Sequence, residues 1–157
     1  MWNSSGTIST MMLSEELLDA YRSTRYRVFV SPTQTFVLRV GQCSAEMQQL
    51  MKATRTTGGV FVTACNPFGE PCQAQENLAA NARLLTRLQG MTSAVFPGEG
   101  ISQDGRWREA SFLALGVSRA QALSLCQEFS QNAVLYFTQA AEPELLFHPE
   151  ISVSGVN

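Results

Sequence analysis

Residues 58–71, GGVFVTACNPFGEP, join an apolar run to a turn that opens with Asn66 and Pro67. The run at 60–65 is short and apolar, which predicts a strand that is buried on both faces. A helix is expected to follow over about residues 73–89, and it contains QENLAANARLLTRL at 75–88. Asn66, Asn77 and Asn81 therefore stand where the core of the domain is expected to close.

On a helical wheel, Asn77 and Asn81 fall inside the apolar arc of this helix, which comprises Leu78, Leu84, Leu85 and Leu88. A buried amide without partners costs about 1–3 kcal/mol, so both side chains are expected to be hydrogen-bonded. Asn66 ends a central strand beside the start of the helix. Open α/β sheets bind ligands at such an edge, and we therefore predict that the three asparagines line one pocket.

A structural interpretation competes with this one. Asn66 precedes a proline and can form an Asx turn, while Asn77 and Asn81 can hold loop carbonyls. In that case the amides form an internal network, and the protein is a non-catalytic regulatory or protein-interaction module. It would then carry an exposed apolar patch elsewhere, whereas an open cavity beside Asn81 would count against it.

The rest of the chain alternates between predicted helices and strands. Helices are expected at 14–22, 44–54 and 118–129, and strands at 26–30, 35–40, 92–96, 110–116, 132–137 and 144–147. PGEGISQDGRW, residues 97–107, is expected to be a glycine-rich loop. The pattern predicts one α/β or α+β domain over residues 13–148, with a mixed sheet of about five to six strands and about four packed helices. Residues 1–12 and 149–157 are expected to be frayed tails.

Further polar candidates surround the glycine-rich segment. Trp107, Glu109 and Ser111 share one side of a strand by period two, and a tryptophan beside a carboxylate raises its pKa by desolvation. Glu109 is accordingly the first candidate for a general acid or base, and Glu99 in PGEG is the second. Alternatively, Trp107 covers the rim of the core and Glu109 pairs with an arginine. Asn132 adds a further amide at the start of a strand.

Composition argues against several classes of function. The net charge is −2 with no run of like charge, which disfavours both a nucleic-acid interface and a polybasic membrane surface. The four cysteines form no Cys-x-x-Cys pair and the single histidine, His148, lies near the C-terminus, so we expect no metal site. No cofactor is indicated. The chain has no secretory signal and no membrane span, which predicts a cytoplasmic protein with reduced thiols.

Several stretches together resemble one family. In order they are YRVFV, VTACNPFGEP, ENLAANARLLTRL, PGEG, GRWREASFLALG and SQNAVLYF, within about residues 20–138. The sequence is similar to the bacterial domain of unknown function 3293 family. The resemblance implies a small, cytosolic, single-domain bacterial protein, and it brings no catalytic residues with it.

The function that these observations favour is binding of a small polar or nucleoside-like ligand in an amide-rich pocket. Paired donors and acceptors of amides suit such a ligand. The predicted ligand-binding residues are Asn66, Asn77, Asn81, Trp107 and Asn132. The sequence leaves open whether the protein is an enzyme and which protein partner, if any, it has.

Overall fold

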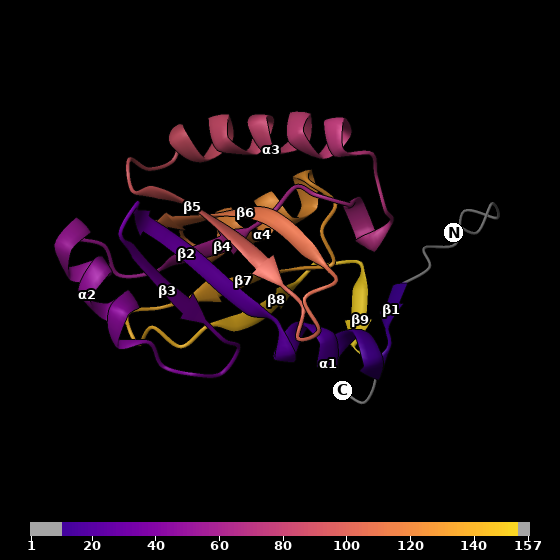
Figure 1. The fold of residues 1–157 in the computed structure, drawn as a ribbon, viewed down its shortest axis with the longest axis horizontal. Helices are drawn as coiled ribbons and strands as arrows, with labels where there is room; N and C mark the ends of the chain where they lie inside the picture. Colours follow the sequence, from indigo (N-terminus) through magenta and orange to yellow (C-terminus); the bar gives the residue numbers. More distant parts are fainter. Residues whose placement is uncertain (1–10, 154–157) are drawn as a thin grey trace.

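A seven-stranded antiparallel sheet forms the centre of the structure, a computed structural model that describes residues 11–153 (Figure 1). The strands lie in the order β3 (Gln34–Leu38), β2 (Arg25–Ser31), β5 (Val95–Ile101), β6 (Arg108–Leu115), β4 (Gly59–Val62), β7 (Ala133–Phe137) and β8 (Glu144–Phe147). Every neighbouring pair in this sheet is antiparallel. The prediction of a mixed sheet with five to six strands is therefore wrong in strand direction and slightly low in count.

The connections explain why the alternating pattern suggested parallel pairing. Helix α3 (Ala74–Gln89) joins β4 to β5, and α4 (Arg119–Glu128) joins β6 to β7. In each case the two joined strands run in the same direction, but one antiparallel strand lies between them. The helical crossovers typical of parallel sheets are thus present, and the hydrogen bonds are nonetheless made to an interleaved antiparallel neighbour.

The segment PGEG is part of strand β5 and does not form the predicted loop. Gly98 is required there because Phe61 and the backbone of β2 approach it closely. A Cβ atom at this position would lie 2.4 Å from the carbonyl oxygen of Arg27 and 2.9 Å from the Phe61 ring. Close approach of a neighbouring backbone is one reason for glycine in a strand. The two glycines of PGEG are therefore strand residues, although glycine-rich segments are more typical of loops.

Polar caps define the helix starts. Ser14 accepts a hydrogen bond from the Leu17 amide before α1 (Glu15–Ser23), and Ser44 accepts one from Met47 before α2 (Ala45–Thr54). Ser118 and Gln121 form the predicted capping box of α4. These bonds satisfy backbone donors that would otherwise have no partner inside the helix.

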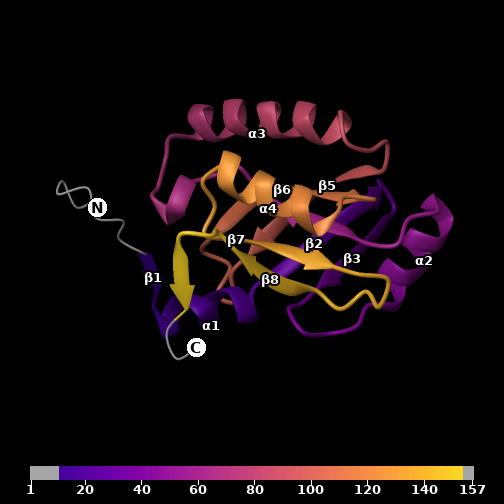
Figure 2. The same ribbon diagram turned by 180° about the vertical axis from the view of Figure 1, so that it is seen from behind.

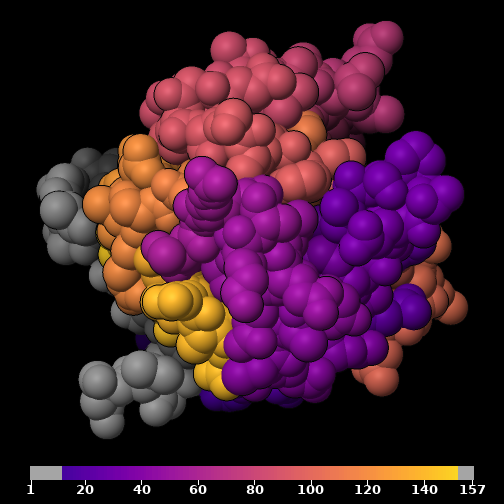
Figure 3. All heavy atoms as spheres, turned by 90° about the vertical axis from the view of Figure 1, so that its left-hand side faces the viewer, coloured from indigo at the N-terminus to yellow at the C-terminus, as the bar shows by residue number. Residues whose placement is uncertain are grey.

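The helices divide between the two faces of the sheet. Helices α3 and α4 pack on one face through alternate residues of β4, namely Val60 and Val62 (Figures 1 and 2). Helix α2 packs on the other face, where Phe61 of the same strand points. Figure 3 shows α2 at the centre of the molecular surface at this end of the sheet. The alternation confirms that β4 is buried on both faces.

Helix α1 lies on the same face as α2, at the opposite end of the sheet (Figure 1). Leu18 is its most deeply buried residue and packs with Leu13 and Ile151. These two neighbours belong to β1 (Met11–Leu13) and β9 (Ile151–Val153), which pair in parallel. The segments predicted as tails thus contain two short paired strands, while residues 1–10 and 154–157 lie outside the described residues. No helix within residues 11–153 is both long and apolar enough to cross a membrane.

Candidate functional site

A cavity of about 360 Å³ lies between α1 and the face of the sheet that α2 leaves uncovered. One wall comes from α1, through Leu17, Ala20 and Tyr21. The floor consists of residues from β2, β4, β6 and β7, including Tyr26, Phe61, Ser111 and Leu135. Its size is near the lower end of the range of about 300–1,000 Å³ that is common for small-molecule sites.

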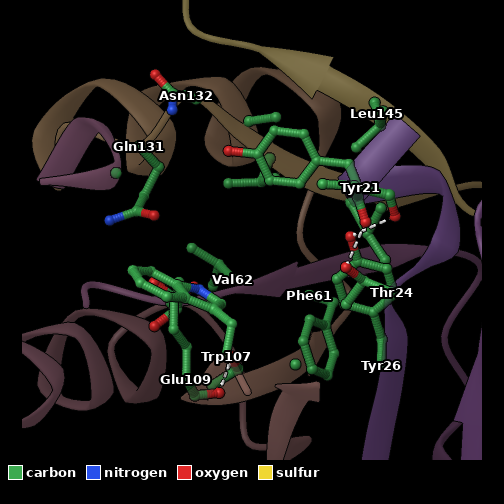
Figure 4. Close-up of a pocket in the computed structure, with 18 of the residues that line it drawn as sticks. Tyr21, Thr24, Tyr26, Phe61, Val62, Trp107, Glu109, Gln131, Asn132 and Leu145 are labelled. Atoms are coloured by element: carbon green, nitrogen blue, oxygen red, sulfur yellow. Dashed lines mark hydrogen bonds between the residues drawn. The ribbon is translucent and has the colours of Figure 1, made fainter. Parts of the chain in front are cut away.

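The cavity has a polar side and an apolar side, as Figure 4 shows. Glu109, Gln131 and Asn132 lie on one side together with Trp107, which is 43 % exposed. Phe61, Tyr26 and Leu145 lie across from them. Lysine, arginine and histidine are absent from the cavity lining within the described chain, and Glu109 is its single carboxylate.

Asn66 holds the Glu109 carboxylate in place. Its Nδ2 donates to Glu109 Oε2 over 2.9 Å. Its Oδ1 accepts from the Cys72 amide and from Asn77 Nδ2, both at 2.9 Å. Because two donors face Oδ1, the amide orientation is unambiguous and the NH₂ group must point at Glu109.

Asn77 completes this arrangement from α3. Its Oδ1 accepts from the backbone amide of Asn66, while its Nδ2 donates to the Asn66 side chain. Asn66 has a left-handed backbone (φ 47°, ψ 66°), a conformation that asparagine tolerates better than most residues. Two hydrogen bonds from a single side chain thus fix a residue whose conformation is otherwise costly.

Asn81 lies one turn further along α3 and is 7 % exposed. Its Oδ1 accepts from the Ala64 amide over 2.9 Å, and its Nδ2 donates to the Ala110 carbonyl at the same distance. A further contact runs from Nδ2 to the Cys65 thiol at 3.3 Å. The expected hydrogen bonding of both helix asparagines is therefore confirmed, and most of their partners belong to the chain that leaves β4.

The structure brings together only part of the predicted site. Asn66, Trp107, Glu109 and Asn132 line the cavity, whereas Asn77 and Asn81 do not. The prediction of one pocket lined by all three asparagines is wrong because α3 covers the opposite face of the sheet. From there its side chains reach the backbone of residues 64–66 and not the cavity.

Glu99 is also remote from the cavity. It pairs across the sheet with Ala110, one residue beyond Glu109, so the two glutamates point to opposite faces. Its carboxylate contacts Arg27 at 3.1 Å and Arg108 at 3.2 Å. The alternative pairing of Glu109 with an arginine is not seen, since Asn66 supplies its hydrogen bond.

Burial of Glu109 raises the pKa of its carboxyl above the ordinary value of 4.5. The hydrogen bond from Asn66 opposes this effect, and so does the neighbouring Trp107 side chain. Burial likewise raises the pKa of the Tyr21 hydroxyl and of the Cys65 thiol. Glu109 therefore ionises at a lower pH than the two tyrosines of the lining, whose pKa values burial raises from 10.0.

Two buried amides keep unused hydrogen-bonding atoms at the cavity. Gln131, 7 % exposed, donates through Nε2 to the carbonyls of Cys65 and Phe129, which turns its Oε1 away from them. The Asn132 side chain, also 7 % exposed, lies beside the Tyr21 hydroxyl, and its hydrogen bond to that group partly offsets the effect of burial on the Tyr21 pKa. No fully buried side-chain oxygen or nitrogen within residues 11–153 lacks a partner, so Gln131 Oε1 is not fully buried, and Gln131 is one of the residues that line the cavity.

Residues 62–134 match the family model described as Protein of unknown function (DUF3293). This match supports the assignment to the DUF3293 family that the sequence suggested. It is shorter than the range of about 20–138 over which the sequence resembled the family. No curated protein and no solved structure matches the chain.

The DUF3293 match contains the whole polar side of the cavity. Asn66, Trp107, Glu109, Gln131 and Asn132 all lie between residues 62 and 134, as do Asn77 and Asn81. The wall from α1 lies outside it. Tyr21 and Tyr26 were not predicted as site residues, because a tyrosine on a helix face or a strand usually belongs to the core. Gln131 adjoins Asn132 at the start of β7, and this pair of amides was its one signal in the sequence.

Two of the four thiols and the histidine are held in the interior of the described structure. Cys65 and Cys126 are buried, and the His148 ring packs edge-on against Phe68 at a centroid distance of 5.3 Å. His148 Nδ1 accepts from the Glu150 amide, so this histidine has a structural partner. Among residues 11–153, no three side chains of the metal-binding types cluster together.

Replacing Asn81 by alanine is expected to lower the free energy of unfolding by about 1–3 kcal/mol, because the buried Ala64 amide loses its partner. The Ala110 carbonyl keeps the Thr63 hydroxyl as a donor at 2.7 Å and adds little to this cost. Urea denaturation measures the difference. Gln75→Ala, at an exposed position of the same helix, is the control and should change stability by less than about 0.5 kcal/mol. Equal stability of the two variants would contradict the bracing role of Asn81.

The stability difference between Glu109→Gln and the wild type is expected to depend on pH. The raised pKa means that the folded protein holds the Glu109 proton more tightly than the unfolded chain does. Wild-type stability therefore falls as pH rises from 4.5 through the raised pKa, whereas the glutamine cannot titrate. The difference should grow in favour of the variant across this window and stay constant above it. Urea denaturation from about pH 4 to pH 8 tests this, and a difference that is flat or shrinks as pH rises would contradict it.

Proposed function

We propose that the protein binds a small organic molecule with an apolar body and an uncharged or positively charged polar group. The observation that carries this proposal is the division of one cavity into an aromatic side and a side with free polar atoms. Aromatic and aliphatic surfaces supply most of the binding energy in such sites, and a few polar groups fix the orientation. The cavity between α1 and the sheet supports this on both counts.

The charge of the cavity lining narrows the class of ligand. Glu109 is its single ionisable carboxylate, and the described lining has no cationic side chain to pair with a phosphate or carboxylate. Planar nitrogen heterocycles, including nucleobases and nucleosides without phosphate, fit these conditions. Nucleotides are disfavoured because their phosphates would be taken out of water without a counter-charge.

The proposal assigns binding and no reaction. Glu109 is the group in the cavity with a suitable position for proton transfer, while Glu99 is excluded from this role by its place on the other face. A cytoplasmic location and a bacterial origin remain predictions from composition and family resemblance. The absence of nucleic-acid, membrane and metal partners is likewise a prediction from the sequence.

The competing proposal is an interaction module whose asparagines are structural. The hydrogen bonds of Asn81 to the Ala64 amide and the Ala110 carbonyl favour a structural role for this asparagine. Its second expectation, an exposed apolar patch, finds less support. The large hydrophobic side chains that are exposed in the described range are Met12, Val37, Leu78 and Trp107, which lie on four separate segments. Leu78, placed in the apolar arc by the helical wheel, is 74 % exposed. We therefore favour bracing asparagines combined with a separate ligand cavity.

A binding assay with and without a blocked cavity tests the proposal. Cytidine, adenosine, indole and benzamide are titrated separately into labelled protein, and the Trp107 indole and Glu109 amide resonances are followed by NMR. We expect at least one of these compounds to shift them, and the nucleotide cytidine monophosphate to bind more weakly than cytidine. Ala20→Phe should weaken binding by tenfold or more, since Ala20 is an exposed α1 residue at the cavity and the added ring enters its space.

Glu16→Phe is the matched control for this variant. It adds the same ring at an exposed position of α1 that does not line the cavity, and it should leave affinity unchanged. The proposal fails if none of the four compounds shifts the cavity resonances. Equal binding by the Ala20→Phe and Glu16→Phe variants would also overturn it.

A further inference from the structure

The free polar atoms of the cavity are mostly hydrogen-bond acceptors. Glu109 Oε2 accepts a hydrogen bond from Asn66 Nδ2, and the Trp107 side chain is a second donor to the carboxyl group. A carboxylate has about four lone-pair sites, so Glu109 keeps about half of its accepting capacity. Both hydrogen bonds of the Gln131 side chain are made through Nε2, which leaves its Oε1 available as an acceptor.

These two acceptors lie on the same side of the cavity, with Trp107 and Asn132 beside them (Figure 4). The Oε1 atoms are not sealed from solvent, since no fully buried side-chain oxygen among residues 11–153 is left without a partner. A ligand that fills the cavity would displace the water at both atoms. It must then replace those hydrogen bonds with donors of its own, or binding is weakened by the desolvation cost.

From these contacts we propose that the ligand carries a positively charged nitrogen group, an ammonium or an amidinium, which donates to Glu109 Oε1 and Gln131 Oε1. This inference rests on the proposed function and specifies its ligand. The apolar body of the ligand lies against Phe61, Tyr26 and Leu145 on the other side. Glu109 determines the specificity for charge, because it is the single carboxylate that residues 11–153 contribute to the lining.

Asn66 acts as a positioning residue for Glu109. One NH₂ group is directed at Oε2 by the hydrogen bonds that Cys72 and Asn77 make to the other end of the amide. Asn66 thus occupies Oε2 and leaves Oε1 available to the ligand. Polar groups that are already held in place need little reorganisation when a ligand binds. Fixing Glu109 through Asn66, Cys72 and Asn77 therefore favours binding.

The other ionisable groups around Glu109 do not compete with it for the positively charged group of the ligand. Tyr21 of α1, Tyr26 of β2 and Cys65 after β4 all have a pKa that burial raises, so they are neutral near pH 7. Arg108 of β6 pairs with Glu99 on the far face of the sheet. Asp104 is exposed in the turn before Trp107, does not line the cavity, and has a pKa lowered by the Arg106 amide. Affinity for a cation should therefore rise with pH as Glu109 ionises.

A matched series of ligands tests the inference. Benzamidine, benzamide and benzoate share one ring and nearly one shape, and they carry a positive, a neutral and a negative group. Each is titrated into the full chain at pH 7 and followed by NMR. We expect benzamidine to bind at least tenfold more tightly than benzamide, which corresponds to about 1.4 kcal/mol, and benzoate to bind most weakly.

Two glutamate variants provide the comparison. Glu109→Gln removes the charge but keeps the shape, so it should reduce the preference for benzamidine to less than threefold while benzamide still binds. Glu99→Gln removes the same charge from the opposite face of the same sheet and should leave the preference unchanged. General attraction of a cation to an acidic protein would weaken equally in both variants.

Asn66→Gly tests the positioning role with a different readout. Glycine tolerates the left-handed backbone of residue 66 but lacks the donor. The pKa of Glu109, followed through its carboxyl ¹³C resonance, should rise further because the bond that favours the ionised form is gone. The rise of benzamidine affinity with pH should move upward by the same amount. If the Glu109 pKa is the same in Asn66→Gly and the wild type, Asn66 does not position the carboxylate.

The outcomes separate the two proposals. If benzamide and benzamidine bind in the cavity with equal affinity, the charged head group is wrong and the proposed function stands. Loss of the preference in Glu99→Gln would overturn the inference in the same way. If no member of this series or of the neutral panel binds at the cavity, both proposals fail.

Discussion

The hydrogen bonds of Asn66 are the constraint on which the site depends. One side chain joins the start of α3, the loop after β4 and the carboxylate on β6, through Asn77, Cys72 and Glu109. Its own backbone is left-handed, and Asn77 also holds its amide. Without these bonds the loop would lose its fixed path, and Glu109 would lose the donor that orients one of its oxygens. The loop also contains Phe68 with φ 52°, and this second unfavourable conformation is held by a 2.7 Å hydrogen bond from the Phe68 amide to the Ser130 carbonyl.

One face of the sheet forms an apolar core, and the other face forms the cavity. On one face, α3 and α4 close an apolar core around β4, and Asn81 links that core to the backbone beyond the strand. On the other, α2 covers only one end, and α1 stands over the remainder with a cavity beneath it. Asn66 lies where the chain passes from one face to the other. Polar residues of α3 therefore influence the cavity without lining it.

Much of this could be predicted from the sequence, and the errors have physical causes. Helical periodicity placed Asn77 and Asn81 on the buried side, and period two placed Trp107 and Glu109 together on a strand. Neither periodicity reveals which face of a sheet a helix will cover, so the asparagines were assigned to the wrong side. Glu99 shows the same limit, because its separation from Glu109 depends on the register of β5 and β6. Tyr21 could be assigned to the site only in the structure, which brings α1 and the sheet to one cavity.

A crystal structure of the wild-type protein with benzamidine at neutral pH shows whether Glu109 binds a cation inside the cavity. We expect the amidinium within hydrogen-bonding distance of Glu109 Oε1, with Asn66 Nδ2 still bound to Oε2 and the ring against Phe61 and Tyr26. Asn77 and Asn81 should keep their bonds to the 64–66 backbone. Benzamidine bound elsewhere on the surface, or a cavity filled by a rearranged side chain with Glu109 turned away, would rule out Glu109 as the cation-binding group.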